Sequence, residues 1–324
     1  MDSRKIFTCS PTEFDSLALE IFRYQYRENI VYNAFCKHLQ LSPDKVRKVE
    51  EIPFLPIQFF KSHQILTGKI TPELTFTSSG TTGQLTSKHL VAKASVYRNS
   101  FLKSFRLFYG DPEDYCILAL LPSYLEREGS SLVYMVNDLI NKSGHPESGF
   151  YLHEHKKLAQ KLVELDSSGI RVLLIGVSFA LLDLVQKYTF SLKNTVVMET
   201  GGMKGRKKEM IREELHTLLK QGFGTVNIHS EYGMTELLSQ AYSRGHGKFE
   251  CPTWMRVMIR DPEDPLTLLS HGKSGGVNII DLANLYSCSF IATQDLGKLH
   301  PGGSFEILGR FDHSDLRGCN LMAL

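Results

Sequence analysis

The run Tyr115-Cys116-Ile117-Leu118-Ala119-Leu120-Leu121 is apolar throughout, and Pro122 ends it. Short apolar runs with β-branched residues recur later in the chain, at 170–177, 195–198 and 225–228. Runs of this kind are typical of parallel strands that are covered on both faces. Segments with helical patterning separate them, at 97–109, 130–140, 156–165, 179–187 and 207–220. The alternation predicts an α/β fold with a mostly parallel sheet and flanking helices.

The two ends of the chain differ from this alternating pattern. Apolar residues from Phe14 to Tyr24 recur at helical spacing and predict an amphipathic helix near the N-terminus. Beyond about residue 240 the chain is richer in glycine, proline and short strand-like pieces, at 277–280, 288–291 and 304–308. We therefore expect two parts: residues 1–240, with the helical N-terminus and an α/β subdomain, and residues 241–324, a smaller β-rich subdomain.

Composition narrows the class of protein. The chain has 324 residues, 42% hydrophobic and 22% charged, which is ordinary for a globular protein. Its net charge of +2 gives no reason to expect a nucleic-acid or membrane-surface partner.

No apolar run approaches the roughly 20 residues of a membrane span, and the start of the chain lacks the apolar core of a signal peptide, so a cytoplasmic location is expected. The cysteines at 9, 36, 116, 251, 288 and 319 form no Cys-x-x-Cys pair, and we expect free thiols.

The loop Thr77-Ser78-Ser79-Gly80-Thr81-Thr82-Gly83 has the chemistry of a phosphate-binding segment. Its glycines let the backbone approach an anion closely, and its hydroxyls supply short donors. The spacing is not that of the common P-loop or of a dinucleotide fingerprint. Taken alone, such a run is also typical of a solvated linker.

Other polar segments follow the apolar runs. Glu199-Thr200-Gly201-Gly202 comes after Met198, residues 229–236 come after Ile228, and Thr293-Gln294-Asp295 comes later. Ligands of open α/β sheets bind beyond the carboxyl ends of the strands. We therefore expect these loops to carry the chemistry.

These segments together resemble motifs of the adenylate-forming enzymes, which include acyl-CoA ligases, luciferases and adenylation domains. Residues 78–83 resemble that superfamily's phosphate loop, and Tyr232-Gly233-Met234-Thr235-Glu236 resembles its Tyr-Gly-x-Thr-Glu motif. Thr293-Gln294-Asp295 is similar to its Thr-Gly-Asp, with Gln294 in place of glycine. Gly309-Arg310-Phe311-Asp312 is similar to its hinge motif.

A narrower resemblance is to the LuxE-type acyl-protein synthetases. It is carried by residues 121–127 with 129–132, and by the tail Ser314-Asp315-Leu316-Arg317-Gly318-Cys319. The resemblance implies the large N-terminal domain of adenylate-forming enzymes, with ATP and the acyl group bound in residues 1–240. It also implies that the small C-terminal domain, which supplies a catalytic lysine, is absent.

The resemblance further implies a function and its residues. The enzyme would use ATP and Mg²⁺ to convert a carboxylic acid, in this family a fatty acid, into an acyl-adenylate. It would then transfer the acyl group to a thiol, for which Cys319 is the candidate in this chain, for delivery to an acyl reductase or acyl-carrying protein partner. The implied catalytic residues are Thr81, Thr82, Thr235, Glu236 and Cys319, with Glu236 also holding the metal. The implied nucleotide contacts are Ser78, Ser79, Gly80 and Gly83 at the phosphates, Gly201, Gly202 and Tyr232 at the base, and Asp295 at the ribose. Gly233 is a further implied nucleotide contact, and Arg310 is implied at the ribose or a phosphate.

Alternatives stay open at this point. Glu236 would complement a helix dipole if a helix began there, Tyr232 would be plain core, and Asp295 would lie in a turn. Cys319 would be an incidental thiol near the end of the chain. At the level of function, the alternatives are an acyl-CoA ligase resembling phenylacetate-CoA ligase and a catalytically silent nucleotide-binding subunit.

Overall fold

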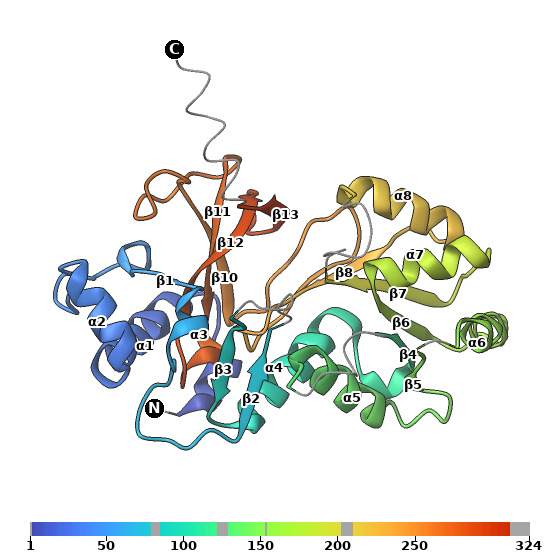
Figure 1. The fold of residues 1–324 in the computed structure, drawn as a ribbon, viewed down its shortest axis with the longest axis horizontal. Coiled ribbons are helices and arrows are strands. Elements are labelled where there is room, and N and C mark those ends of the chain that lie inside the picture. The colour runs from blue at the N-terminus through green and yellow to red at the C-terminus, as the bar shows by residue number, and fades with distance from the viewer. Residues whose placement is uncertain (1, 79–84, 122–128, 153, 202–209, 312–324) are drawn as a thin grey trace, which may run out of the picture. The chain divides into compact units, whose positions relative to one another are not determined.

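The computed structural model of the chain describes residues 2–78, 85–121, 129–152, 154–201 and 210–311 (Figure 1). The chain forms two compact units. The terminal unit contains Met1–Thr71 and Thr253–Leu324, and the central unit contains Pro72–Pro252. This division differs from the one predicted at residue 240, because the N-terminal helices pack with the β-rich segment rather than with the α/β part.

The central unit is built on a six-stranded sheet with the order β5-β4-β6-β7-β8-β9 (Figure 1). The strands are β4 (Cys116–Leu120), β5 (Gly149–Phe150), β6 (Val172–Val177), β7 (Thr195–Thr200), β8 (His229–Tyr232) and β9 (Ala241–Ser243). Neighbouring strands are parallel except for the pair β8–β9. Every residue of β4 and β6 is buried, as expected for strands covered on both faces. The predicted α/β fold with a mostly parallel sheet is confirmed.

Helices cover both faces of this sheet. They are α4 (Ala94–Tyr109), α5 (Ser131–Ser143), α6 (His155–Ser167), α7 (Ser178–Lys187) and α8 (Arg212–Phe223), with a short 3-10 helix at Pro112–Asp114. In the sheet, β5 lies on one side of β4, whereas β6, β7 and β8 follow one another on its other side. Right-handed crossovers then place α5 on one face and α7 and α8 on the other (Figure 1).

Strand β8 lies further along the chain than predicted. Residues 225–228 were expected to form it, but they are irregular, and only Ile228 among them is buried. Gly224 ends α8 in the left-handed region, with φ of 66°, and the next residues are needed to bring the chain back to the sheet. β8 is therefore His229–Tyr232, and part of the segment predicted as a loop lies within the sheet.

An antiparallel hairpin, β2 (Leu74–Thr77) with β3 (Lys88–Val91), also belongs to the central unit. Its buried Phe76 packs against Tyr97 of α4 and Tyr134 of α5, with ring centroids 5.2 and 5.7 Å apart. These contacts fix the hairpin on α4 and α5.

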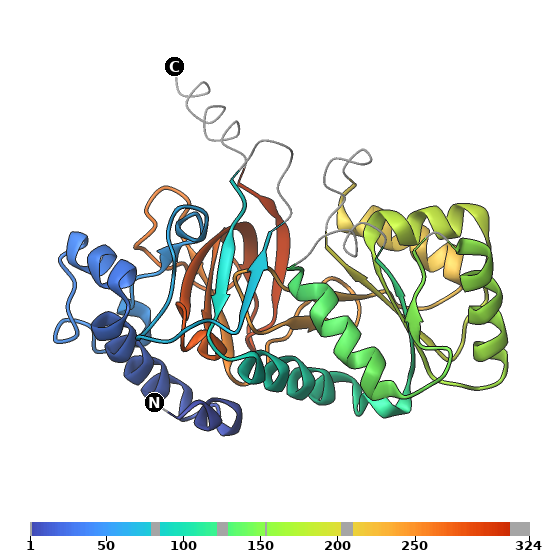
Figure 2. The ribbon, with the colours of Figure 1, turned by 60° about the horizontal axis from the view of Figure 1, so that its bottom comes forward.

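The terminal unit contains a second sheet, in the order β1-β12-β11-β10, with β13 paired to β12 (Figure 2). Its strands are β1 (Leu55–Pro56), β10 (Met255–Arg260), β11 (Ser274–Asp281), β12 (Phe290–Leu299) and β13 (Phe305–Arg310). Its helices are α1 (Phe14–Glu28), α2 (Ile30–His38) and α3 (Phe59–Ser62), with 3-10 helices at Ser3–Thr8, Val49–Glu51 and Leu282–Asn284.

Buried side chains tie the N-terminal helices to this second sheet. Gln25 of α1 donates to the carbonyl oxygens of Asn284 and Leu285, each at 3.0 Å, in the connection between β11 and β12. Phe7 packs edge-on against Trp254, with ring centroids 5.2 Å apart. None of the helices in the described ranges is long and apolar enough to cross a membrane.

Candidate active site

Three parallel strands end at the carboxyl edge of the central sheet. Strands β6, β7 and β8 are adjacent and parallel, and they end at Val177, Thr200 and Tyr232. The direction of the connections reverses between β4 and β6, which is where ligands of open α/β sheets bind. The structure therefore brings Gly201, after β7, and Gly233, after β8, to the same edge of the sheet as the switch point.

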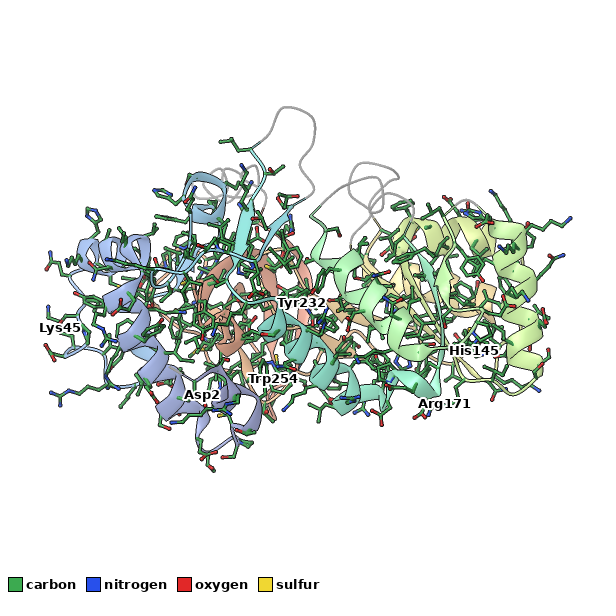
Figure 3. The ribbon with its side chains drawn as sticks, turned by 90° about the horizontal axis from the view of Figure 1, so that it is seen from below. Asp2, Lys45, His145, Arg171, Tyr232 and Trp254 are labelled. Carbon is green, nitrogen blue, oxygen red and sulfur yellow. The ribbon has the colours of Figure 1, made fainter. Side chains whose placement is uncertain are left out.

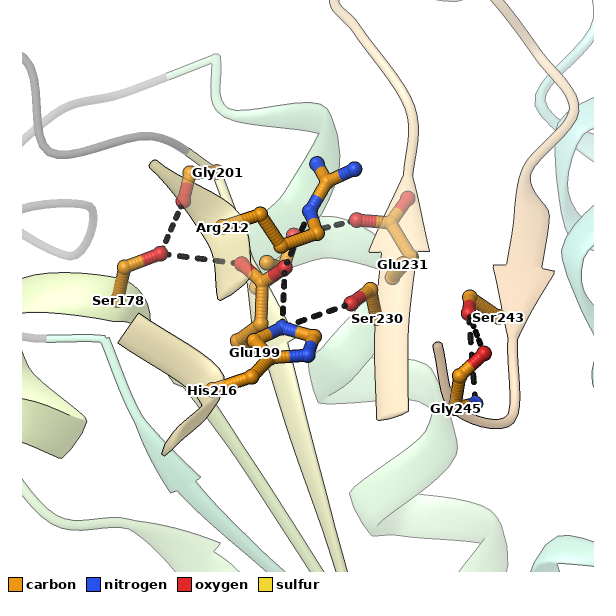
Figure 4. A network of polar contacts seen from close by, with 10 residues as sticks. Ser178, Glu199, Gly201, Arg212, His216, Ser230, Glu231, Ser243 and Gly245 are labelled. Carbon is orange, nitrogen blue, oxygen red and sulfur yellow. Dashed lines mark hydrogen bonds and ion pairs between the residues drawn. The ribbon is translucent and has the colours of Figure 1, made fainter. Parts of the chain in front are cut away.

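Glu199 of β7 is the hub of a buried polar network at this edge (Figure 4). The Oγ atom of Ser178 lies 3.0 Å from Oε2 of Glu199 and 2.7 Å from the carbonyl oxygen of Gly201. A serine hydroxyl has one proton, so these two acceptors share it. Gly201 has φ of 74°, in the left-handed region that favours glycine.

Two basic side chains face the same carboxylate from α8. Nε2 of His216 and Nε of Arg212 lie 3.6 and 3.7 Å from Oε1 of Glu199. Burial alone raises the pKa of Glu199, but the hydrogen bond from His216 and the charge of Arg212 outweigh it, and the net pKa is lowered. Glu199 is therefore ionised at neutral pH.

Tyr232 lies at the end of β8 with 9% of its surface exposed (Figure 3). Its ring packs edge-on against Phe249, with centroids 5.8 Å apart. The guanidinium carbon of Arg212 lies 4.9 Å from the centroid of Phe249, a cation–π contact. Arg212 thus links Glu199 to the aromatic pair.

Glu231 points to the opposite face of the sheet from its neighbours Ser230 and Tyr232, as alternation in a strand requires. Its carboxylate accepts a short hydrogen bond from the Thr200 hydroxyl. Burial raises the pKa of Glu231 to about 7, and the negative charge of Glu199 acts in the same direction. A Cβ atom added at Gly233 would collide with Oε1 of Glu231, so a larger residue here would require the Glu231 carboxylate to move.

The β2–β3 hairpin carries the described part of the predicted phosphate loop. Ser78 and Ser87 close its base: the amide of Ser78 donates to the Ser87 carbonyl at 3.0 Å, and the amide of Ser87 donates to Oγ of Ser78 at 2.9 Å. His89 of β3 is fully buried, and its Nδ1 atom lies 2.9 Å from the carbonyl oxygen of Thr235. The hairpin and the Tyr232–Glu236 segment are thereby joined.

Thr235 and Glu236 lie in a turn, in which the amide of Leu237 donates to the Met234 carbonyl at 3.1 Å. Residues 237–240 are not helical, so the alternative that Glu236 complements a helix dipole is wrong. Mg²⁺ at nucleotide sites usually takes one or two protein carboxylates together with substrate phosphates and water. In the described part of the chain, no group of three or more His, Cys, Asp or Glu side chains is arranged to hold a metal ion. Glu236 supplies one carboxylate in this turn, and its role at a metal stays a prediction.

The predicted ribose motif lies in a central strand, not in a loop. Thr293 and Asp295 belong to β12, which pairs with β11 on one side and β13 on the other. Both side chains are buried, whereas Gln294 between them is more exposed. Because this segment is polar, its strand alternation was not recognised from the sequence. The alternative that Asp295 lies in a turn is wrong.

Two arginines accompany Asp295 within the terminal unit. Arg310 is its register partner on β13, and Nε of Arg310 donates to Oδ1 of Asp295 at 3.1 Å. Arg260 donates to the Thr293 carbonyl at 2.6 Å. Burial lowers the pKa of Arg260 to about 10, so it stays charged at neutral pH. Half of the Arg310 side chain is exposed, at 54%, so it remains accessible to a ligand.

Seven of the predicted site residues lie outside the described residues, and their roles stay predictions: Ser79, Gly80, Thr81, Thr82, Gly83, Gly202 and Cys319.

The five described cysteines are free thiols. Burial raises the pKa of Cys9, Cys36, Cys116 and Cys288, that of Cys36 to about 12. A raised pKa suppresses the thiolate, which is the nucleophilic form. These four thiols are therefore poorly suited to accept an acyl group. Cys251 is partly exposed.

Five polar residues of this edge and of the hairpin were not predicted as functional from the sequence: Ser178, His216, His89, Glu199 and Glu231. Ser178, His216 and His89 carry no local signal, because their partners are distant in the chain. The two glutamates do carry one: each is an acidic residue within a strand, two positions before a motif glycine.

The fold is shared with known ligases. MatB from Rhodopseudomonas palustris with ATP bound is similar at 18% identity and a TM-score of 0.54, over 75% of this chain and 49% of that chain. The chain therefore spans about half the length of that protein. A 2-hydroxyisobutyryl-CoA ligase in the postadenylation state is similar at 12% identity and a TM-score of 0.68, over 95% of this chain and 70% of that one. At these identities the likeness establishes the fold alone, and it confirms the fold predicted from the adenylate-forming enzymes.

Comparison with curated proteins gave no match. The family model for acyl-protein synthetase, LuxE, matches residues 10–323, which is nearly the whole chain. The chain belongs to the LuxE acyl-protein synthetase family.

Proposed function

We propose that this chain activates a fatty acid with ATP and transfers the acyl group to a thiol. The family match across residues 10–323 carries the proposal. The arrangement of Gly201, Tyr232 and Gly233 at the carboxyl edge of the central sheet supports it, because that edge is where open α/β sheets bind ligands.

In the first step, a carboxylate oxygen attacks the α-phosphorus of ATP. The bond between the α-phosphorus and the bridging oxygen breaks, and pyrophosphate leaves. Negative charge gathers on the phosphate oxygens, so the hydroxyls of Thr81, Thr82 and Thr235 would stabilise the transition state as donors. Glu236 would hold Mg²⁺, which neutralises phosphate charge when it is bound.

The remaining assigned residues would bind the nucleotide. Ser78, Ser79, Gly80 and Gly83 would complete the phosphate loop. Tyr232 would stack on adenine, and Gly201, Gly202 and Gly233 would let the backbone approach it. Asp295 would accept hydrogen bonds from the ribose hydroxyls, with Arg310 beside it.

In the second step, the thiolate of Cys319 attacks the acyl carbon of the adenylate. The bond from that carbon to the AMP oxygen breaks, AMP leaves, and a thioester remains on the protein. A tethered nucleophile reacts rapidly because its encounter with the adenylate is intramolecular. The thioester would then pass the acyl group to an acyl reductase partner.

The test is to incubate the protein with ATP, Mg²⁺ and labelled fatty acid and to separate it on a denaturing gel. We expect hydroxylamine-sensitive label on the wild type and on Cys251→Ser, the matched control, and its loss in Cys319→Ser. Label that survives Cys319→Ser unchanged would exclude Cys319 as the acceptor. Added coenzyme A separates the alternative: a free acyl-CoA product without protein label would indicate a CoA ligase.

A further inference from the structure

Glu199 is connected to both segments assigned above to the adenine base, through one side chain to the first and through two side chains to the second. We propose that Glu199 is a positioning residue for the nucleotide, which fixes Gly201 through Ser178 and Tyr232 through Arg212 and Phe249. The inference rests on the proposed function, because that function assigns Gly201 and Tyr232 to the base.

The first connection restrains the backbone where it leaves β7. Ser178 is the first residue of α7 and is buried. Its hydroxyl reaches Oε2 of Glu199 at 3.0 Å and the carbonyl oxygen of Gly201 at 2.7 Å. Because Gly201 adopts a left-handed conformation with few steric limits, a hydrogen bond to its carbonyl is what selects one backbone orientation.

The second connection restrains the aromatic ring. The guanidinium of Arg212 lies between the Glu199 carboxylate, 3.7 Å away, and the face of Phe249, 4.9 Å away. Phe249 in turn packs on Tyr232. A ring that is already held in place loses less conformational freedom when a base stacks on it, which increases affinity.

The negative charge of Glu199 carries the second connection. Nε of Arg212 and Nε2 of His216 approach the same oxygen, Oε1, so a neutral side chain of the same shape would lose the ion pair with Arg212. Glutamine at this position still offers an oxygen to Ser178. Glu199→Gln therefore removes the charge while it keeps the size.

Asp166 provides a matched control. It is a buried acid of the same unit, and it accepts hydrogen bonds from the amides of Lys193 and Asn194 and from the Thr195 hydroxyl. These residues lie at the start of β7, at the opposite edge from Glu199. Asp166→Asn therefore weakens the fold without touching the site.

The test measures the dissociation constants of ATP and AMP by calorimetry and the thermal midpoint of each variant. We expect Glu199→Gln to weaken both nucleotides by about tenfold, equivalent to about 1.4 kcal/mol. Ser178→Ala should weaken both by a smaller factor. Its effect should shrink in the Glu199→Gln background, because residues that act through one another are not additive. Asp166→Asn should lower the thermal midpoint and leave both constants unchanged.

The outcomes distinguish a failure of the positioning role of Glu199 from a failure of the proposed function. If folded Glu199→Gln binds ATP and AMP as tightly as the wild type, the positioning role is wrong. Should Glu199→Gln fail to fold, Ser178→Ala decides: unchanged affinities in the folded variant overturn the inference, and weaker binding of both nucleotides supports it. A wild-type protein that binds neither nucleotide overturns the proposed function itself, and this inference with it.

Discussion

The Nδ1 atom of His89 lies 2.9 Å from the carbonyl oxygen of Thr235. A carbonyl oxygen only accepts, so Nδ1 carries the proton and donates. Burial lowers the pKa of His89 to about 4, and the ring is neutral at physiological pH. This bond joins the hairpin that flanks residues 79–84 to the turn that contains Glu236.

Replacement of His89 should weaken ATP use as well as the fold. His89→Leu leaves the Thr235 carbonyl without this donor, and we expect the free energy of unfolding to fall by about 1–3 kcal/mol. The KM for ATP should rise severalfold, because the turn loses its link to the hairpin. In His89→Asn the amide nitrogen takes the place of Nδ1. This variant should therefore recover most of the lost free energy of unfolding and most of the wild-type KM for ATP. Urea unfolding and initial rates at varied ATP check this; a leucine variant with unchanged KM would show that the bond is only structural.

Glu231 should make the stability of the protein depend on pH. Burial raises its folded-state pKa from 4.5 to about 7, so the folded protein binds this proton more tightly than the unfolded chain does. Its stabilising contribution is complete below pH 4.5 and is lost as pH rises through about 7, on the order of 3 kcal/mol. Three tyrosines near Glu231 stay neutral because their pKa values are raised: Tyr97 and Tyr109 on α4 and Tyr242 on β9. Glu199, the other acid nearby, is ionised.

The matching variant is Glu231→Gln, compared with the wild type by urea unfolding between about pH 5 and pH 8. The wild type should lose more stability than the variant across this range. Equal losses in the two proteins would contradict the assignment of this titration to Glu231.

Gly233→Ala should damage the site through a steric clash. The new Cβ would collide with Oε1 of Glu231, whose carboxylate is held by Thr200. Overpacking of this kind costs about 1–3 kcal/mol, and the displaced Tyr232–Glu236 segment should bind ATP more weakly. Gly149→Ala is the control, because nothing lies within 4 Å of its added Cβ. Comparable ATP affinities in the two variants would contradict the account.

Asp295 should recognise the ribose. We expect Asp295→Asn to weaken ATP binding by about tenfold or more, because the charge-assisted hydrogen bonds to the hydroxyls are lost. Binding of 2′,3′-dideoxy-ATP should change little, since it lacks both hydroxyls. Glu306→Gln, an acid of the same sheet that bonds His300, is the control and should bind both nucleotides normally. An equal loss for the two nucleotides would show that Asp295 acts only through the fold.

The sequence predicted the central sheet well because its strands are apolar runs separated by amphipathic helices. It failed where a strand is polar: β8 and the Thr293–Asp295 part of β12 are charged or hydroxylated, and their burial comes from neighbouring strands. The network around Glu199 was not predictable either. Ser178, His216 and Glu199 come from three separate elements, and only folding brings Ser178 and His216 within 4 Å of the Glu199 carboxylate.

The most direct test of acyl activation is exchange of labelled pyrophosphate into ATP, measured with and without a panel of fatty and aromatic acids. The account predicts exchange that requires a fatty acid and that persists in Cys319→Ser, because the adenylate forms before the thiol acts. ATP binding without exchange in the presence of any acid would contradict it and would favour a catalytically silent nucleotide-binding subunit.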